Sequence, residues 1–436
     1  MTRVACVLGA ALLASLLVTG TAHAQGPPVV RQTLANGMTV LVRESAASGV
    51  VAVSLQVRAG SRFETESTAG ITNFLHRTMV RGTVRRTGIQ LTTDAEDIGG
   101  SIDASGEVET AEIRGRALAR HWETLLGLVA DVALRPALRA DEVEKERRLI
   151  LGQIKARADS PFPVSFDAVL RQLYGTNPYG LNQLGSRESV ERLTRDDLLE
   201  YYRTIYQPDR MVLAVSGEVD RKAVVKTVDR LFGRMARSGS GPQSPPPVSD
   251  PPGERKVIER PAQQAQILVG YLGPSLSDPM YPAVRVLAAA LGGGMAGRLF
   301  AELRDRQGLA YATQVYIAPR TGPTFLIAYI GTAPASLATA EAGVLRELAR
   351  VRSAPIDGEE LARAKAYVKG TLVMDRRTNA RQAWYLAFFE TIGAGWDYPD
   401  RYARAIDAVT ADDVARAAQR YLTRPSIVVL QPTSRR

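Results

Sequence analysis

The sequence predicts an α+β protein made of two similar halves, and three observations favour this fold class. A segment rich in Pro, Gly and Ser over residues 238–255 has no apolar periodicity and is typical of an exposed linker. Each half has an early alternating, Val-rich strand, at residues 51–57 and 266–271. Each half also ends with a strand that follows a helix, at residues 211–215 and 426–430. We therefore expect a duplicated domain of antiparallel sheet plus helices.

The linker sets the domain boundaries. We expect an N-terminal domain over residues 25–237 and a C-terminal domain over residues 256–436, joined by the linker. The length of 436 residues suits two to three domains. Hydrophobic residues make up 45% and charged residues 23%, which excludes a wholly disordered chain and a fibrous rod.

The first 24 residues are typical of a secretory signal peptide. Arg3 gives a positive start, residues 4–18 are almost wholly apolar or small, and Ala22 and Ala24 suit signal peptidase. The alternative is a membrane anchor, for which the apolar run is short, since a span needs about 20 residues. We expect cleavage after Ala24, a periplasmic or secreted protein, and no stable insertion in a membrane.

Charge and cysteine content exclude several functions. The net charge is +10, with no basic stripe interleaved with aromatic residues, so we expect no nucleic-acid binding. The only cysteine, Cys6, lies in the signal peptide, so the mature chain has no disulfide and no Cys-bound metal. His76 and His121 are the only histidines after Ala24. We interpret His121, beside Trp122 at a helix start, as structural.

Two helices of the first half carry polar side chains of interest. Residues 69–80 have an apolar stripe at helical spacing, and Asn73, His76 and Arg77 lie opposite it, away from the expected core. A second helix begins near Asp141, with Glu144 as a candidate capping-box residue. Three residues of this helix share one face: Glu146, Leu149 and Gln153.

These segments resemble the insulinase-type (pitrilysin, or M16) metallopeptidase family. Residues 69–83 are similar to the family's zinc helix, and further motifs follow in the family's order over nearly the whole mature chain. They are Asn177-Pro178-Tyr179-Gly180, Leu184-Gly185-Ser186, Tyr206-Gln207-Pro208-Asp209, Gly217-Glu218-Val219-Asp220, Leu291 to Phe300 and Leu303 to Tyr311. The resemblance implies two halves that close like a clam around a peptide substrate.

The chain departs from the family at the zinc motif. Family members hold zinc with two imidazoles in H-x-x-E-H, and the glutamate between them activates water. Those three positions are Asn73, His76 and Arg77 here, and Gln153 stands where the family has its third ligand. Of the family's acidic residues at this site, only the one that lies behind the metal ligands is present here, as Glu146. We therefore expect no zinc and no catalytic residue in this chain, and interpret His76 as a surface or cleft histidine.

The second half keeps what the resemblance assigns to substrate binding. Arg304 and Tyr311 match an Arg and a Tyr, seven residues apart, with which family members bind peptide. Physically, a guanidinium can donate to peptide carbonyls and a phenol to an oxyanion. The alternative is a solvated arginine and a core tyrosine. Gly292, Gly293 and Gly294 resemble the family's glycine-rich loop, which either allows substrate backbone to pass or is only a tight turn.

The resemblance supports a hypothesis of function. A chain with a degenerate zinc motif and an intact Arg–Tyr pair is similar to the non-catalytic subunit of a heteromeric zinc endopeptidase. Its partner would be a zinc-bearing sibling subunit, and its substrate a peptide. The alternatives are a scaffold or binding protein without a part in proteolysis, and an active metallopeptidase with unusual ligands. The substrate's identity and the choice between homodimer and heterodimer stay open.

Overall fold

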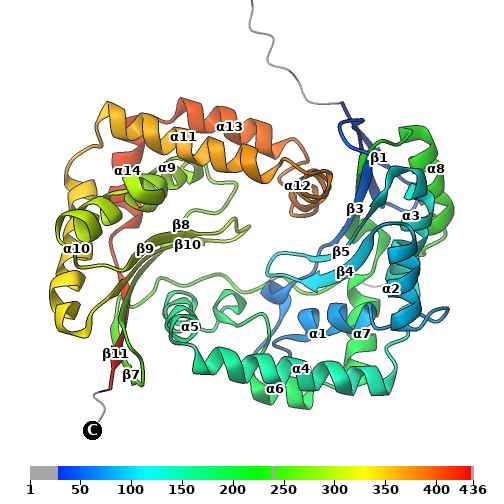
Figure 1. The fold of residues 1–436 in the computed structure, drawn as a ribbon, viewed down its shortest axis with the longest axis horizontal. Helices are drawn as coiled ribbons and strands as arrows, with labels where there is room; N and C mark the ends of the chain where they lie inside the picture. The colour runs from blue at the N-terminus through cyan, green and yellow to red at the C-terminus, as the bar shows by residue number, and fades with distance from the viewer. Residues whose placement is uncertain (1–27, 238–240, 434–436) are drawn as a thin grey trace, which may run out of the picture.

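The computed structural model describes residues 28–237 and 241–433, so the expected signal peptide lies outside the described residues. Each half contains one β-sheet and its own group of helices, and the halves lie side by side (Figure 1). The predicted α+β fold of two similar halves is therefore confirmed. Within the described ranges, no helix combines the length and apolar character that a membrane span requires.

The first half is organised around a six-stranded sheet with the order β1-β2-β6-β3-β5-β4. Its strands are β1 (Val29–Thr33), β2 (Thr39–Glu44), β3 (Val50–Val57), β4 (Ser101–Gly106), β5 (Ala111–Leu118) and β6 (Met211–Gly217). Neighbouring strands are antiparallel except for the parallel pair β2 and β6. Val57 of β3 pairs with Met211 on one side and Ala111 on the other.

The second half repeats this topology in a five-stranded sheet with the order β7-β11-β8-β10-β9. Its strands are β7 (Arg255–Arg260), β8 (Ala265–Gly273), β9 (Ala312–Ile317), β10 (Thr324–Thr332) and β11 (Ser426–Pro432). The closing strand β11 is parallel to β7 and antiparallel to β8, as β6 is to β2 and β3. The two sheets therefore share one strand order, apart from β1 at the edge of the first.

Helices of the same half cover one face of each sheet. In the first half they are α1 (Ile71–Met79), α2 (Gly88–Asp97), α3 (Trp122–Leu134), α4 (Ala140–Asp159), α6 (Arg187–Arg192), α7 (Arg195–Ile205) and α8 (Arg221–Phe232). In the second half they are α9 (Tyr281–Gly292), α10 (Leu337–Ser353), α11 (Gly358–Asp375), α13 (Tyr398–Ala408) and α14 (Ala411–Tyr421). Their apolar stripes form one large buried core in each half.

The start of α4 differs from the prediction. Arg139 precedes the helix without a side-chain cap, and Asp141 lies inside the first turn. The predicted capping box of Asp141 and Glu144 is therefore wrong. Asp141 and Glu142 instead place negative charge in the first turn, where it favours the positive end of the helix dipole.

The opposite face of each sheet is covered by a helix from the other half. Helix α5 (Pro161–Tyr174) of the first half packs on β8 and β11, and α12 (Asn379–Thr391) of the second half packs on β3 and β6. Val169 and Leu173 of α5 approach Gly270 of β8 closely, because a Cβ at Gly270 would lie 2.8 Å from Val169. In Figure 1, α5 lies beside the sheet of the second half and α12 beside the sheet of the first.

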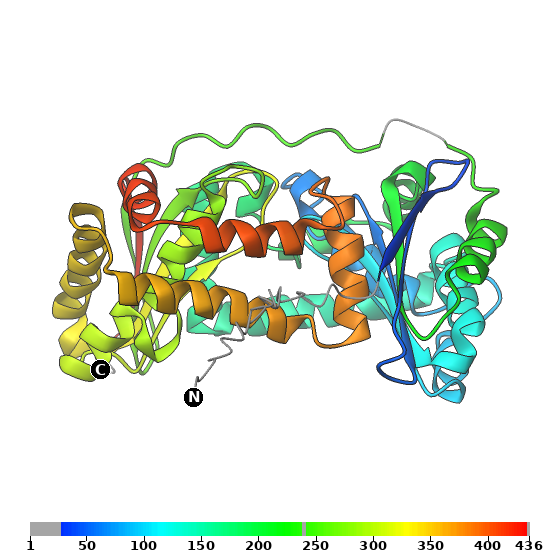
Figure 2. The ribbon, with the colours of Figure 1, turned by 90° about the horizontal axis from the view of Figure 1, so that it is seen from above.

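The linker crosses one side of the molecule from half to half, as Figure 2 shows. Its described residues, 241–254, form no helix or strand. The side-chain amide of Asn177 donates to the carbonyl of Pro246 at 2.6 Å, and Val248 packs against the cluster around α5. The linker is therefore attached to the body of the protein along its proline-rich part.

A buried carboxylate also joins the halves. Glu109, in the turn between β4 and β5, accepts from Arg62 at 2.9 Å, from Thr321 Oγ1 at 2.7 Å and from the Tyr179 hydroxyl at 2.7 Å. Thr321 belongs to the β9–β10 loop of the second half, whereas the other three residues belong to the first. Each oxygen of Glu109 thus has a partner, as a buried charge requires.

We predict that Glu109→Gln lowers the free energy of unfolding by about 2–4 kcal/mol, because the half-buried Arg62 loses its counter-charge. Urea denaturation of the purified protein measures the effect. Glu66→Gln is the matched control, since Glu66 pairs with Arg171 at the surface, where an ion pair contributes about 1 kcal/mol or less. Equal effects of the two variants would show that the buried network adds no stability.

Candidate functional site

Helix α1 carries the degenerate zinc motif, and a buried carboxylate holds its start. The backbone N–H groups of Gly70 and Thr72 donate to the two oxygens of Glu64, at 2.8 and 2.9 Å. Gly70 adopts φ 90°, and a Cβ there would meet the carbonyl oxygen of Leu184 at 2.6 Å, so only glycine fits. Burial raises the pKa of Glu64 to about 7, although these hydrogen bonds oppose the shift.

Arg77 bridges the two helices where the family places its metal. Its Nε donates to Glu146 at 2.9 Å, and its Nη1 donates to Gln153 at 2.7 Å. Arg81, one turn later, donates to the other oxygen of Glu146 at 2.5 Å. Glu146 is buried, so two guanidinium groups neutralise a carboxylate that water does not reach. The structure thus brings Arg77, Glu146 and Gln153 together.

His76 lies elsewhere than predicted. It is fully buried, with Nδ1 2.7 Å from the carbonyl oxygen of Thr72 and Nε2 2.9 Å from the hydroxyl of Tyr206. Because a carbonyl can only accept, Nδ1 carries the proton and Nε2 accepts from Tyr206. The interpretation of His76 as a surface or cleft histidine is therefore wrong. The imidazole lies on the core side of α1, with its ring centre 5.8 Å from that of Tyr206.

Asn73 occupies the first ligand position without replacing an imidazole. It is half-buried, and its side-chain Nδ2 has no hydrogen-bond partner among the described residues. Its backbone lies against the end of β4, where a Cβ on Gly106 would be 2.6 Å from the Asn73 nitrogen. Asn73 is therefore placed by close packing of α1 on β4.

These residues do not fit a zinc ion. Zinc requires three or four imidazole, thiolate or carboxylate ligands around one point. Among Asn73, His76, Arg77, Glu146 and Gln153 the only carboxylate is Glu146, which two arginines already occupy, and both nitrogens of His76 are engaged in hydrogen bonds. Throughout residues 28–237 and 241–433, no group of three or more His, Cys, Asp or Glu side chains could hold a metal. A permanent guanidinium cation stands where a divalent cation would need to be.

The second half holds Arg304 and Tyr311 at its surface. Arg304 lies on η6 (Phe300–Arg306), with its guanidinium 4.7 Å from the centre of the Phe300 ring. Tyr311 precedes β9, its backbone N–H donates to Gly331, and its side chain is 59% exposed. Neither side chain forms an ion pair or a side-chain hydrogen bond with another described residue. Both are therefore free to contact a ligand, and their role in substrate binding stays a prediction.

The run of three glycines begins at Gly292, the last residue of α9, and close contacts restrict the side chains that could stand there. A Cβ on Gly292 would lie 2.6 Å from Val315, and one on Gly293 would lie 2.4 Å from the carbonyl oxygen of Ala289. Gly294 is exposed and adopts φ 76°, which other residues avoid. Close packing thus accounts for Gly292 and Gly293 and the backbone angle for Gly294, and passage of substrate backbone stays a prediction.

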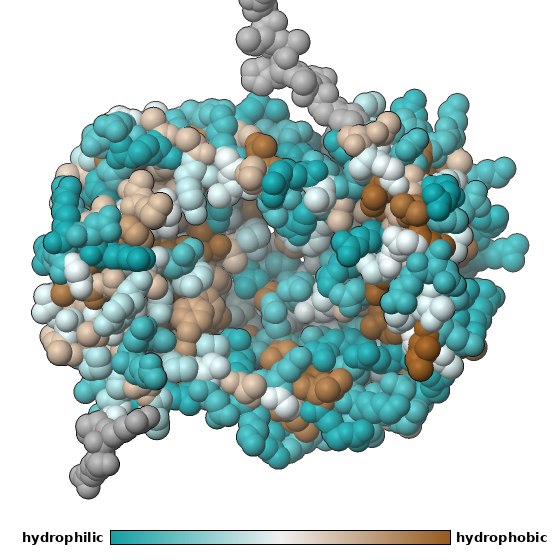
Figure 3. All heavy atoms as spheres, in the orientation of Figure 1, coloured by the Kyte–Doolittle hydropathy of each residue, from teal (hydrophilic) through white to brown (hydrophobic). Residues whose placement is uncertain are grey.

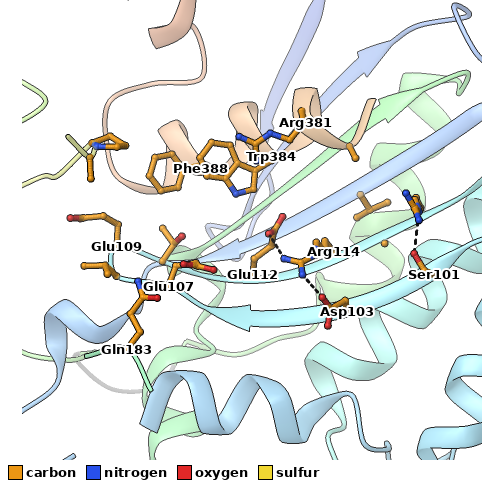
Figure 4. Close-up of a pocket in the computed structure, with 18 of the residues that line it drawn as sticks. Ser101, Asp103, Glu107, Glu109, Glu112, Arg114, Gln183, Arg381, Trp384 and Phe388 are labelled. Atoms are coloured by element: carbon orange, nitrogen blue, oxygen red, sulfur yellow. Dashed lines mark hydrogen bonds and ion pairs between the residues drawn. The ribbon is translucent and has the colours of Figure 1, made fainter. Parts of the chain in front are cut away.

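A cavity of about 750 Å³ lies between the halves, and sequence reasoning missed it. Figure 3 shows the molecule hollowed at this place. In Figure 4, Glu107 and Glu112 of the β4–β5 hairpin face Trp384 and Phe388 of α12 across the cavity. Burial raises the pKa of Glu112, against the hydrogen bond from Ser54. Arg304 and Tyr311 do not line this cavity.

One signal in the sequence could have indicated this wall. Glu112, Arg114 and Arg116 alternate along β5 with Ile113 and with small residues that face the core. A polar residue at every second position of a central strand indicates that its second face lines a cavity or faces water. Trp384 and Phe388 form the aromatic wall of the cavity, with their rings stacked 4.5 Å apart. This wall leaves no such signal, because its helix, α12, comes from the other half.

Comparison with known proteins places the chain in a family. The family model "Insulinase (Peptidase family M16)" matches residues 39–187, and "Peptidase M16 inactive domain" matches residues 192–368. An uncharacterized zinc protease of Mycobacterium leprae is 30% identical over 408 residues, covering 92% of this chain and 91% of that protein. Another, from Rickettsia bellii, is 27% identical over 389 residues, covering 89% and 93%. The chain belongs to the insulinase (peptidase M16) family, as its motifs predicted.

Solved structures show the same fold. A protease from Helicobacter pylori superposes with a TM-score of 0.87 at 19% identity, covering 94% of this chain and all 100% of that one. A peptidase M16 inactive domain from Pseudomonas fluorescens gives 0.86 at 21% identity, covering 93% and 98%. At these identities the likeness establishes the architecture and leaves the activity to be argued from the site.

We predict that Arg77 and Glu146 are energetically coupled. Arg77→Met leaves a buried carboxylate with only Arg81, so the free energy of unfolding should fall by about 2 kcal/mol. A double-mutant cycle with Glu146→Met, followed by urea denaturation, should give a coupling energy of about 1–3 kcal/mol. Arg148→Met, on the exposed face of α4, is the control. Additive effects at positions 77 and 146 would contradict a stabilising bridge.

We predict that His76 makes the protein less stable in acid. Burial lowers the pKa of His76 to about 4 from an ordinary 6.5, so the folded state resists the proton that the unfolded state accepts. This contribution to stability is full above pH 6.5 and is lost as the pH falls towards 4, by roughly 3 kcal/mol.

The stability difference between wild type and His76→Gln, measured by urea denaturation from pH 7.5 to 4, isolates this effect. The comparison is needed because Glu64 has the opposite effect on stability. Its pKa is raised in the folded protein, so Glu64 increases the stability of the folded state as the pH falls from 7 to 4.5. His121→Gln controls for the loss of a histidine at the start of α3. A difference that does not vary with pH would contradict the buried neutral imidazole.

Proposed function

We propose that this chain is a non-catalytic peptidase subunit, which supplies Arg304 and Tyr311 to a zinc-bearing M16 sibling in peptide hydrolysis. The observation that carries the proposal is the bridge of Arg77 to Glu146 and Gln153, because it fills the metal position with a fixed cation. A chain without metal ligands contributes to hydrolysis only through binding and positioning groups.

Two side chains of the second half are suited to that work. The guanidinium of Arg304 has free donors for the carbonyl oxygens of a peptide, and the ring of Phe300 supports it from one side. The Tyr311 hydroxyl is exposed and can donate to an oxyanion that develops on the substrate carbonyl. The zinc and its activated water belong to the sibling, so this chain binds and orients the peptide.

The proposal includes export. The expected signal peptide over residues 1–24 and its cleavage after Ala24 would place the mature chain in the periplasm or the medium. A sibling subunit in the same compartment would carry its own signal peptide and an intact H-x-x-E-H motif. A scaffold without a part in proteolysis is the competing function, and the interlocked halves would suit it equally well.

The test is peptide cleavage by the complex of this chain with a zinc-bearing sibling from the same genome. We predict that Tyr311→Phe and Arg304→Ala each lower turnover by about a hundredfold, because a lost oxyanion donor acts mainly in the transition state. The complex should still assemble, which size-exclusion chromatography checks. Tyr421→Phe and Arg306→Ala are matched controls, since the Tyr421 hydroxyl contacts Asp278 and the Arg306 guanidinium contacts Glu302 within this chain.

Two outcomes would overturn the proposal. If both variant complexes assemble and cleave at the wild-type rate, the Arg–Tyr pair takes no part and the scaffold function stands. If the chain alone binds one zinc and cleaves peptides, the bridge at Arg77 does not exclude metal and the chain is an enzyme in its own right.

A further inference from the structure

A second cavity, of about 310 Å³, lies inside the second half. Helices α9, α11, α12 and α13 enclose it, and its walls include Leu276, Tyr281, Phe389, Tyr398 and Tyr402. Pro319 lines both this cavity and the larger one between the halves, so the two are neighbours. Its size accommodates about one large side chain with its backbone groups.

One cation, Arg285 of α9, lines this aromatic cavity. Its Nε donates to the Tyr402 hydroxyl at 3.2 Å, and its Nη1 makes a long contact of 3.5 Å with the carbonyl oxygen of Ile317. The Nη2 group has no hydrogen bond in the described part of the chain, and no carboxylate there pairs with Arg285. Arg285 is half-buried, and a guanidinium has five N–H donors. Arg285 therefore has donors to spare.

The neighbouring groups do not supply the missing charge. The one carboxylate that lines the cavity, Asp375, accepts from the Tyr385 hydroxyl at 2.8 Å and pairs with Arg381. Burial raises the pKa of Tyr281 and of Tyr398, so their phenols stay neutral at physiological pH. Arg298 shows the contrast within the same half, because Glu360 holds its guanidinium through two contacts of 2.6 and 2.8 Å.

We infer that this cavity binds a carboxylate carried on an apolar body, with the carboxylate on Arg285 and the apolar part against Tyr281 and Phe389. Guanidinium and carboxylate match in a planar, two-pronged contact, and the Tyr398 and Tyr402 hydroxyls add polar groups beside it. The apolar walls favour such a ligand over phosphate or sulfate, which would lose much hydration. The C-terminal residue of a peptide and a free organic acid both present this chemistry.

This site is separate from Arg304 and Tyr311, and the inference does not require the sibling subunit. The test is calorimetric titration of the purified mature chain with N-acetyl-phenylalanine and with its amide, which lacks the charge. We expect the acid to bind and the amide to bind at least tenfold more weakly. A pentapeptide ending in phenylalanine, with a free or an amidated C-terminus, separates the two sources. A peptide that binds more tightly than the small acid identifies a peptide C-terminus as the ligand.

Variants assign the binding to Arg285. Arg285→Met should weaken binding of the acid at least tenfold and leave binding of the amide unchanged, and Arg404→Met, at the exposed face of α13, should change neither. Arg285→Lys keeps the charge in case the methionine variant does not fold, and it should bind the acid more weakly than wild type. The inference is overturned if acid and amide bind equally, if neither binds at millimolar concentration, or if a folded Arg285 variant binds the acid as wild type does.

Discussion

The exchange of one helix between the halves is the packing constraint on which the rest of the structure depends. Helix α5 leaves the first half to cover the second sheet, and α12 returns from the second half to cover the first. Each sheet is therefore buried on both faces only when both halves are present. Helix α12 and the β4–β5 hairpin line the cavity between the halves, and Glu109 of that hairpin binds Thr321 of the second half at its edge. Arg62 and Tyr179 of the first half and Thr321 of the second half complete that edge, because all three donate hydrogen bonds to Glu109.

The helix pair α1 and α4 shows how a metal site can become a structural one. In a zinc site, the ion neutralises the acids around it and holds two helices together. Here the guanidinium of Arg77 does both, because it contacts Glu146 and Gln153 of the facing helix. A guanidinium carries positive charge, as zinc does, but it cannot bind and polarise a water molecule. The fold of the family thus occurs here with a guanidinium, and not a set of metal ligands, between these two helices.

Local patterns in the sequence predicted what is local in the structure. The apolar stripe of residues 71–79 predicted α1, and the spacing of seven residues placed Glu146 and Gln153 on one face of α4, where Arg77 meets both. Contacts between distant segments left no such pattern. Periodicity put His76 on the polar side of α1, and only Tyr206, 130 residues later, explains why the ring is buried. The helix exchange and the aromatic wall of the cavity were missed for the same reason, because both depend on how the halves dock.

The buried His76 has a consequence for any attempt to build a metal site in this chain. A glutamate returned to position 76 would lie beneath the Tyr206 hydroxyl with no basic partner on the core side, and a histidine returned to position 77 would leave Glu146 short of a cation. Each of these single substitutions therefore lowers the stability of the protein before a bound metal ion could compensate for the loss. A route from this chain to a family-like metal site therefore requires several substitutions together, because each of them alone disturbs either the buried histidine or the guanidinium bridge.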